Sequence, residues 1–172
     1  MRKITLTVLL LSALSFFAQA QEKTFSISGK IELDKGNLLV LTQRPGKIDT
    51  LAKTAIANRQ FSISGTTEEA VVAQLVIEGY AGGFVMILEP GEEYTANLTQ
   101  NGNGDIRGGK LQTAYNEYQK IVVNANAESR ALNKKASEAA AQKHFKTSKE
   151  LQTKANKVQE AAFAKMNNIV RK

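Results

Sequence analysis

Phe25-Ser26-Ile27-Ser28-Gly29 alternates apolar or small residues with polar ones, and the alternation continues to Leu33. A period of two residues places one set of side chains on each face of an extended strand. The same alternation returns in Phe61-Ser62-Ile63-Ser64. This pattern predicts half-buried β-strands, each with one face in a core and the other in water.

Six further segments have strand character, and turn residues separate them at short intervals. We predict an α+β protein whose first part is an antiparallel β-sandwich or open barrel of about seven to eight strands. The nearly continuous apolar run 70–77 predicts a central strand covered on both faces, or one lying against the helical part. The expected strands are 25–33, 38–42, 50–57, 60–64, 70–77, 84–88, 94–98 and 105–108.

From Lys110 the apolar period changes to alternating steps of three and four, which is typical of a helix with one buried stripe. The stripe fails between 140 and 150 and then resumes in a shifted phase. Thr147-Ser148-Lys149-Glu150 fits a capping box that starts a second helix, and one continuous helix with a stutter is the alternative. Small residues in the stripe suit a close antiparallel helix pair or docking on the sheet. The stripe consists of Leu111, Tyr115, Tyr118, Val122, Ala125, Ser129, Leu132, Ala136 and Ala139, then Leu151, Ala155, Val158, Ala162, Met166 and Ile169.

The first twenty residues have the pattern of a secretory signal peptide. Met1-Arg2-Lys3 is basic, the segment 4–17 is apolar, and Ala18-Gln19-Ala20 provides the small residues that signal peptidase requires. A membrane anchor is the alternative, but about 14 helical residues span only about 21 Å of a hydrocarbon core of about 30 Å. We therefore expect a signal peptide at 1–20, a β domain at 21–109 and a basic helical segment at 110–172.

Charge and cysteine content narrow the classes of function. The net charge of +7 divides unevenly: residues 21–109 carry 8 Lys or Arg against 11 Asp or Glu, whereas residues 110–172 carry 13 against 5. The absence of cysteine excludes disulfides, thiolate catalysis and sulfur-ligated metal sites. The basic helices lack interleaved aromatic residues, so we expect no nucleic acid partner. Their lysines solvate the helix faces or attract acidic lipid head groups or acidic protein clients.

The residues that could perform chemistry have simpler explanations. His144, the sole histidine, stands among lysines and is expected to be a solvent-exposed helix residue rather than a metal ligand or base. The glycines of 79–83 and 102–109 are interpreted as hairpin turns, because no helix begins immediately after a loop of phosphate-binding size with a lysine in the Walker position. Carboxylates recur in two places that are explained by turn solvation, and we predict no catalytic residue, cofactor or metal site. These carboxylates are Glu68, Glu69, Glu89, Glu92 and Glu93.

Four motifs and the tyrosine-bearing helix after them resemble the N-terminal module catalogued as domain of unknown function 4369, over about residues 22–120. That resemblance implies a module that precedes a helical linker and a thioredoxin-like domain in exported Gram-negative proteins similar to thiol-disulfide oxidoreductases. The Cys-x-x-Cys of such a domain is absent here, so no catalytic residue carries over. A stand-alone module and a shortened relative both fit. The motifs are Phe25–Gly29, Gln60–Gly65, Leu88–Glu92 and Ile106–Gly109.

We therefore predict a non-enzymatic binding or scaffolding module, periplasmic or associated with the cell envelope. Its partner is an unidentified protein, with a thioredoxin-like protein as the class that the resemblance suggests and peripheral membrane contact through the basic helices as a further expectation. The oligomeric state is left open. A holdase-like chaperone and a carboxylate-dependent hydrolase are the alternatives, and the hydrolase requires carboxylates from separate strands to converge in one pocket.

Overall fold

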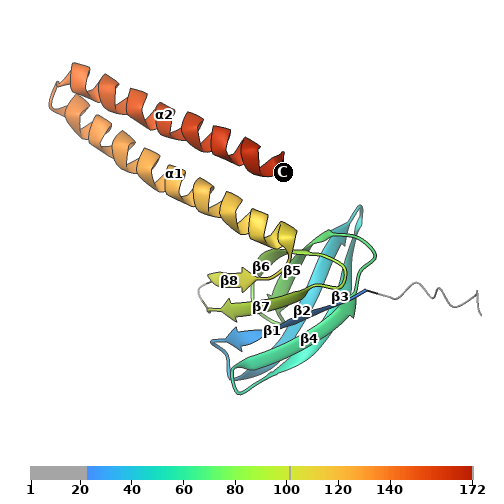
Figure 1. Ribbon diagram of the computed structural model, residues 1–172. Coiled ribbons are helices and arrows are strands. Elements are labelled where there is room, and N and C mark those ends of the chain that lie inside the picture. The colour runs from blue at the N-terminus through green and yellow to red at the C-terminus, as the bar shows by residue number, and fades with distance from the viewer. Residues whose placement is uncertain (1–22, 101, 172) are drawn as a thin grey trace, which may run out of the picture.

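The computed structural model describes residues 23–100 and 102–171, in which eight strands precede two helices (Figure 1). The predicted signal peptide lies outside these residues. None of the helices within them is long and apolar enough to cross a membrane. The elements are β1 (Thr24–Ile31), β2 (Lys35–Arg44), β3 (Lys47–Ala57), β4 (Gln60–Thr66), β5 (Val71–Ile77), β6 (Phe84–Leu88), β7 (Glu93–Leu98), β8 (Gly104–Arg107), α1 (Lys110–Ala141) and α2 (Phe145–Val170).

The eight strands form one sheet in the order β6-β5-β2-β3-β4-β1-β7-β8, curled into a nearly closed barrel. The predicted α+β fold class is confirmed, and the open barrel is the form adopted. One pair departs from the antiparallel prediction, because β1 and β7 run parallel. The chain passes from the edge strand β6 through the turn 89–92 to the free side of β1, where β7 lies parallel to it. The barrel stays open between β6 and β8.

The two Phe-Ser-Ile-Ser-Gly segments lie side by side in β1 and β4. Their antiparallel register sets Phe25 opposite Gly65 and Phe61 opposite Gly29, with Ile27 opposite Ile63. Gly65 leaves room for the ring of Phe25, because a Cβ at residue 65 would lie 2.7 Å from Phe25 Cζ. A Cβ at Gly29 would instead collide with the backbone of Ala96 on the neighbouring strand β7. The four large side chains are buried at the centre of the core. The repeated motif thus specifies a pair of strands that complement each other.

The apolar run that begins at Ala70 is less covered than predicted. It forms β5, an interior strand between β2 and β6, and its inward residues Ala73, Leu75 and Ile77 are buried. On the opposite face, however, the side chain of Val72 is 64% exposed. The expectation of cover on both faces is wrong at this position, because α1 packs mainly against β6 and β8. The other outward residues of β5, Gln74 and Val76, are half-buried.

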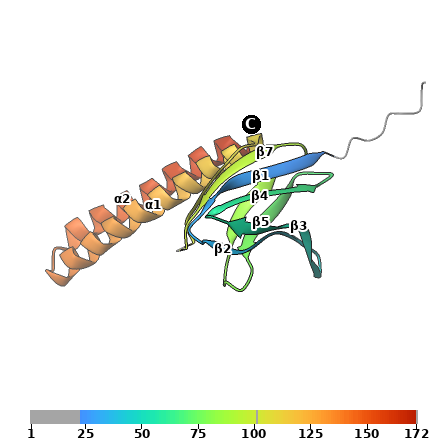
Figure 2. The same cartoon turned by 90° about the horizontal axis from the view of Figure 1, so that it is seen from below.

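The segment after Gly109 forms two antiparallel helices, α1 and α2, here called the arm (Figures 1 and 2). The single-helix alternative is wrong. α1 ends where Lys143 N and His144 N donate to the carbonyls of Ala140 and Ala139, with Lys143 at φ 61°. α2 begins directly afterwards with His144 as its N-cap, so the predicted capping box at 147–150 lies inside the helix.

The arm is held together by small residues. The buried positions of α1 beyond its first turns and those of α2 are all Ala or Ser, and those of α2 recur every seven residues. Such side chains allow two helix backbones to approach closely. Gln159 Nε2 also donates to the Ala125 carbonyl across the pair. Of the two arrangements predicted for the stripe, the close antiparallel pair is the one adopted, with Ala125, Ser129 and Ala136 on α1 and Ser148, Ala155 and Ala162 on α2 as its buried small residues.

Candidate functional site

The described part of the chain concentrates its buried polar contacts where the arm leaves the barrel, here called the junction. The first helical N–H groups of α1 have no partner within the helix, and the N-cap residue Gly109 has no side chain to satisfy them. Glu89, in the β6–β7 turn, supplies the missing acceptor: its Oε2 lies 2.8 Å from Leu111 N. A carboxylate at this end of a helix also interacts favourably with the helix dipole.

Gly109 is required at this place for two reasons. Its φ of 62° lies in the left-handed region, which is costly for residues with a Cβ. A Cβ there would also collide with the Glu89 carboxylate and would lie 2.9 Å from the Tyr94 hydroxyl. The Gly-Gly motif before the helix therefore creates the space in which a barrel carboxylate reaches the helix terminus.

Tyr94, on β7, fixes the backbone of Glu89. Its hydroxyl oxygen accepts a hydrogen bond of 2.7 Å from Glu89 N, and its side chain is buried. Burial, which disfavours the phenolate, raises the pKa of Tyr94 above its ordinary value of 10.0. The tyrosine is therefore neutral at physiological pH and serves as a positioning group for the residue that caps α1.

Two amides on α1 connect the open edges of the barrel. Ile87 N of β6 donates to Gln112 Oε1 at 2.7 Å, and Gln112 Nε2 donates to Asn116 Oδ1 at 2.8 Å. Asn116 Nδ2 then donates to the Ile106 carbonyl of β8 at 2.7 Å. The helix thus satisfies one donor and one acceptor on the two strands that lack a neighbour. Gln112 is only 1% exposed, and its side chain accepts the hydrogen bond that a neighbouring strand would otherwise accept from β6.

The sequence-predicted carboxylates do not assemble into one site. Glu68 and Glu69 are exposed in the β4–β5 connection. Glu92 is exposed in the β6–β7 turn, and Glu93 is exposed at the start of β7. Among the described residues, no group of three His, Asp or Glu side chains is placed to hold a metal ion. Glu89 differs from these carboxylates, because it accepts a hydrogen bond from Leu111 N at the start of α1. Turn solvation does not explain this contact, and the sequence did not predict it.

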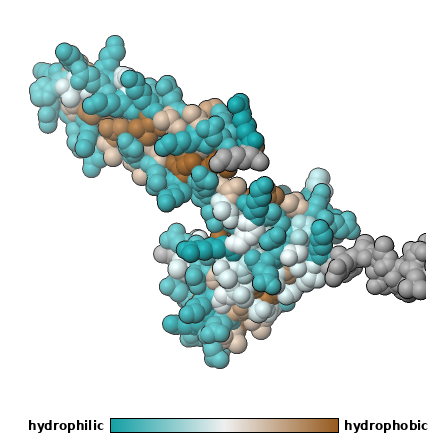
Figure 3. Space-filling model, in the orientation of Figure 1, coloured by the Kyte–Doolittle hydropathy of each residue, from teal (hydrophilic) through white to brown (hydrophobic). Residues whose placement is uncertain are grey.

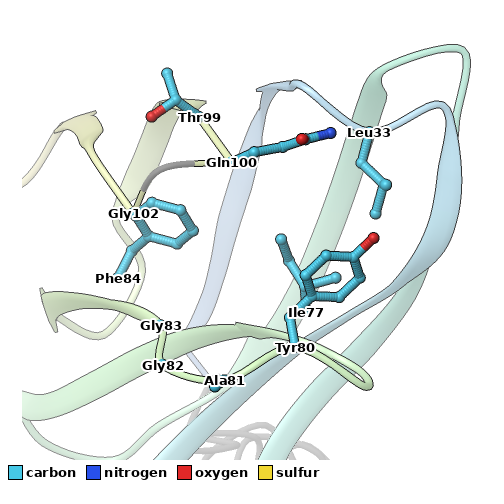
Figure 4. Close-up of a pocket in the computed structure, with 10 residues that line it drawn as sticks. All are labelled: Leu33, Ile77, Tyr80, Ala81, Gly82, Gly83, Phe84, Thr99, Gln100 and Gly102. Carbon is cyan, nitrogen blue, oxygen red and sulfur yellow. The ribbon is translucent and has the colours of Figure 1, made fainter.

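The glycine segment 79–83 and Gly102, at the start of the segment 102–109, come together at one end of the barrel (Figure 4). The β5–β6 and β7–β8 connections and the β1–β2 turn surround a small hollow there. Its volume of about 50 Å³ has room for a water molecule or two, each of which occupies about 30 Å³ in the liquid. The lining includes Leu33, Ile77, Tyr80, Phe84 and Gln100.

A second hollow of about 250 Å³ lies on the outer face of β1, β7 and β8. Its lining includes the hydroxyl side chains of Ser26 and Ser28 on β1 and Thr95 on β7. The guanidinium of Arg107 at its edge pairs with Asp105, with Nη2 and Oδ2 2.7 Å apart. Glu93 is the single carboxylate among its lining residues. The paired acids that a hydrolase would need are not brought together here.

The arm carries most of the exposed large apolar side chains (Figure 3). Phe163 is 62% exposed on α2, and Tyr118, predicted to lie on the buried stripe of α1, is 36% exposed. The five ion pairs among the described residues all join barrel residues, so the charges of the arm face solvent. His144 is exposed as predicted and caps α2 without a side-chain hydrogen bond.

Comparison with known proteins gives one match of family level. A family model described as "Domain of unknown function (DUF4369)" matches residues 25–115, from the first residues of β1 to the second turn of α1, and so contains Glu89, Tyr94 and Gln112. No curated protein matches the chain. A crystal structure of a 9R-lipoxygenase from Cyanothece PCC8801 is similar at a TM-score of 0.30 and 16% identity, covering 45% of this chain. This chain spans 16% of that lipoxygenase, and the likeness carries no argument.

Proposed function

The chain belongs to the family described as Domain of unknown function (DUF4369), and from this premise we propose that it is a non-enzymatic, exported binding or scaffolding module. The barrel is the base of the module, and the arm presents a binding surface for a protein partner. A thioredoxin-like protein is the partner class that the sequence resemblance favours.

The observation that carries this proposal is the use of polar side chains at the junction. Hydrogen bonds of Glu89, Gln112 and Asn116 attach α1 to the barrel. Glu89 accepts from the first turn of α1, Gln112 accepts from β6, and Asn116 donates to β8. A helix fixed to its base in this way keeps a constant direction, which a scaffold requires. The surface of the arm beyond the junction is free of ion pairs among the described residues and displays apolar groups such as Val123 and Phe163.

Export is the second part of the proposal and rests on the first twenty residues. Their basic start, apolar centre and Ala18-Gln19-Ala20 pattern favour cleavage after Ala20. Mass spectrometry of the protein purified from the envelope fraction of its host should give a mature chain that begins at Gln21. A full-length chain in the cytoplasmic fraction would contradict export, and Ala18→Leu with Ala20→Leu should block cleavage in the control.

Site-specific photo-crosslinking in living cells tests the binding role. A photoreactive residue in place of Val123 or Phe163, both on the arm, should give a discrete adduct with one protein. The matched controls are Ile48 and Val72 on the barrel, which are 66% and 64% exposed and should give none. Adducts from the barrel positions alone, or from no position, would overturn the assignment of the arm as the binding surface.

A further inference from the structure

The end of the arm farthest from the barrel has an unusual charge distribution. This end, here called the tip, comprises residues 134–149, with the chain reversal at 142–144 (Figure 1). Against Glu138 within these residues and Glu150 directly after them, it carries five exposed lysines, none of them in an ion pair among the residues that the structure describes. The lysines are Lys134, Lys135, Lys143, Lys146 and Lys149.

Three of these lysines occupy places that disfavour them. Lys143 has φ 61°, at the position after a helix where glycine or asparagine is preferred. Lys146 and Lys149 lie in the first turns of α2, where the helix dipole is positive, and no acid in the first turn offsets them. Local conflicts of this kind, gathered in one place, are typical of functional sites.

The tip also exposes an aromatic ring. Phe145, the first residue of α2, is 69% exposed, the second-largest exposed fraction among the large apolar side chains of the described residues. Lys149 lies four residues later and therefore on the same side of the helix. An aromatic ring with long basic side chains around it can enter the boundary between lipid head groups and acyl chains, while the ammonium groups remain at the level of the phosphates.

We propose that the tip docks on an anionic lipid bilayer. The occupant is a lipid surface rather than an acidic protein because the tip is the narrow end of two helices, and a stable protein interface needs about 800 Å² from each partner. The tip contributes no residue to either of the two hollows described above, so the proposed contact is with its convex surface. This proposal deepens the proposed function and rests on it only for the assignment of the arm as the part of the module that binds.

The chain has no tryptophan, so one introduced indole reports on a single place. Phe145→Trp is the probe, and Phe163→Trp is the matched control, because it is also exposed on α2 but lies 18 residues, or about 27 Å, away along the helix. With vesicles of equal phosphatidylglycerol and phosphatidylcholine, emission from residue 145 should shift to the blue and be quenched by brominated acyl chains. The emission of the tryptophan at residue 163 should change little.

Charge variants separate attraction to lipid from a general effect of net charge. Each lysine near an anionic bilayer strengthens binding about fivefold, so Lys143→Gln, Lys146→Gln and Lys149→Gln together should weaken vesicle binding about a hundredfold. The matched triple Lys110→Gln, Lys120→Gln and Lys165→Gln removes the same charge near the barrel and should weaken binding less than tenfold. The tip triple should unfold at the same or a higher temperature, since it removes cations from the start of α2.

Three results would overturn the proposal: no fluorescence change at residue 145, equal binding to vesicles of phosphatidylcholine alone, or equal losses in the two triple variants. Binding of the tip to soluble polyglutamate without binding to vesicles would also overturn it, and would indicate an acidic protein as partner. If the tip does not bind vesicles but Val123 or Phe163 gives a discrete crosslink, the lipid proposal is wrong and the proposed function stands. The two proposals can therefore be tested independently.

Discussion

At the scale of single residues, the complementarity of Phe25 and Gly65 is tested by adding one carbon atom. A Cβ on Gly65 would lie 2.7 Å from Cζ of Phe25 and 3.0 Å from the Leu51 carbonyl oxygen. Gly65→Ala should therefore destabilise the barrel by about 1–3 kcal/mol through overpacking, measured by urea unfolding. Phe25→Leu should relieve part of the clash, so the double variant should be more stable than additivity predicts. Strict additivity would contradict the contact.

Tyr94 gives a prediction that depends on pH. Tyr94→Phe leaves the N–H of Glu89 without its acceptor and should cost about 1–3 kcal/mol at pH 7, measured as a lower Tm. Since burial raises the pKa of Tyr94, the folded and unfolded chains both keep the proton below pH 10. Above pH 10 the unfolded chain loses it first, and the stability that depends on the neutral tyrosine is lost as pH rises toward the folded pKa.

The advantage of the wild-type chain over Tyr94→Phe should therefore shrink as the pH rises above 10. Lysine titration in the same range affects both proteins equally and cancels in the difference. A difference in Tm that stays constant across this range would show that the hydroxyl is not buried as described.

At the scale of elements, Gln112 links the arm to the edge of the barrel. Gln112→Leu keeps a side chain of similar length but leaves Ile87 N and the Asn116 amide without their partner. The loss should be about 1–3 kcal/mol in chemical unfolding, together with faster hydrogen exchange at the Ile87 amide. Gln119→Leu is the control, since Gln119 bonds to Tyr115 on the exposed helix surface and should change stability by less than about 0.5 kcal/mol.

The elements themselves could be predicted from the sequence, because alternation and helical period are local. All eight strands lie within a few residues of their predicted places, and Pro45-Gly46, a pair typical of turns, joins β2 to β3. The side-chain motif that begins at Thr147 predicts that the second helix starts there. The chain instead reverses through backbone hydrogen bonds at Lys143, a residue whose side chain gives no sign of that conformation.

The junction could not be predicted, because its partners lie far apart in the chain. Glu89 and Leu111 are 22 residues apart, and Ile87 and Gln112 are 25 apart. The register of the parallel pair β1–β7 is equally nonlocal. One signal was present: Gln112 and Asn116 lie one helical turn apart beside the apolar stripe, at positions where a helix packed on a sheet would ordinarily carry apolar residues.

At the scale of the whole molecule, the barrel and the arm form a base with a spacer. The 32 residues of α1 span about 48 Å at a rise of about 1.5 Å per residue. α2 returns along α1 without forming a comparable contact with the sheet, so the direction of the arm depends on the first turns of α1. If the junction is loosened, the arm should remain folded while its orientation becomes variable.

Distance measurement by electron paramagnetic resonance can separate these two properties, because the chain has no native cysteine to interfere with spin labelling. Labels at Ser62→Cys on β4 and Lys134→Cys near the tip should give one narrow distribution. Replacing both Gln112 and Asn116 with Ala should broaden it, since α1 then loses its bonds to β6 and β8. A control pair at Asn124 and Lys157 within the arm should stay narrow in both proteins. A broad distribution in the wild-type chain would remove the rigid spacer on which the scaffolding role depends.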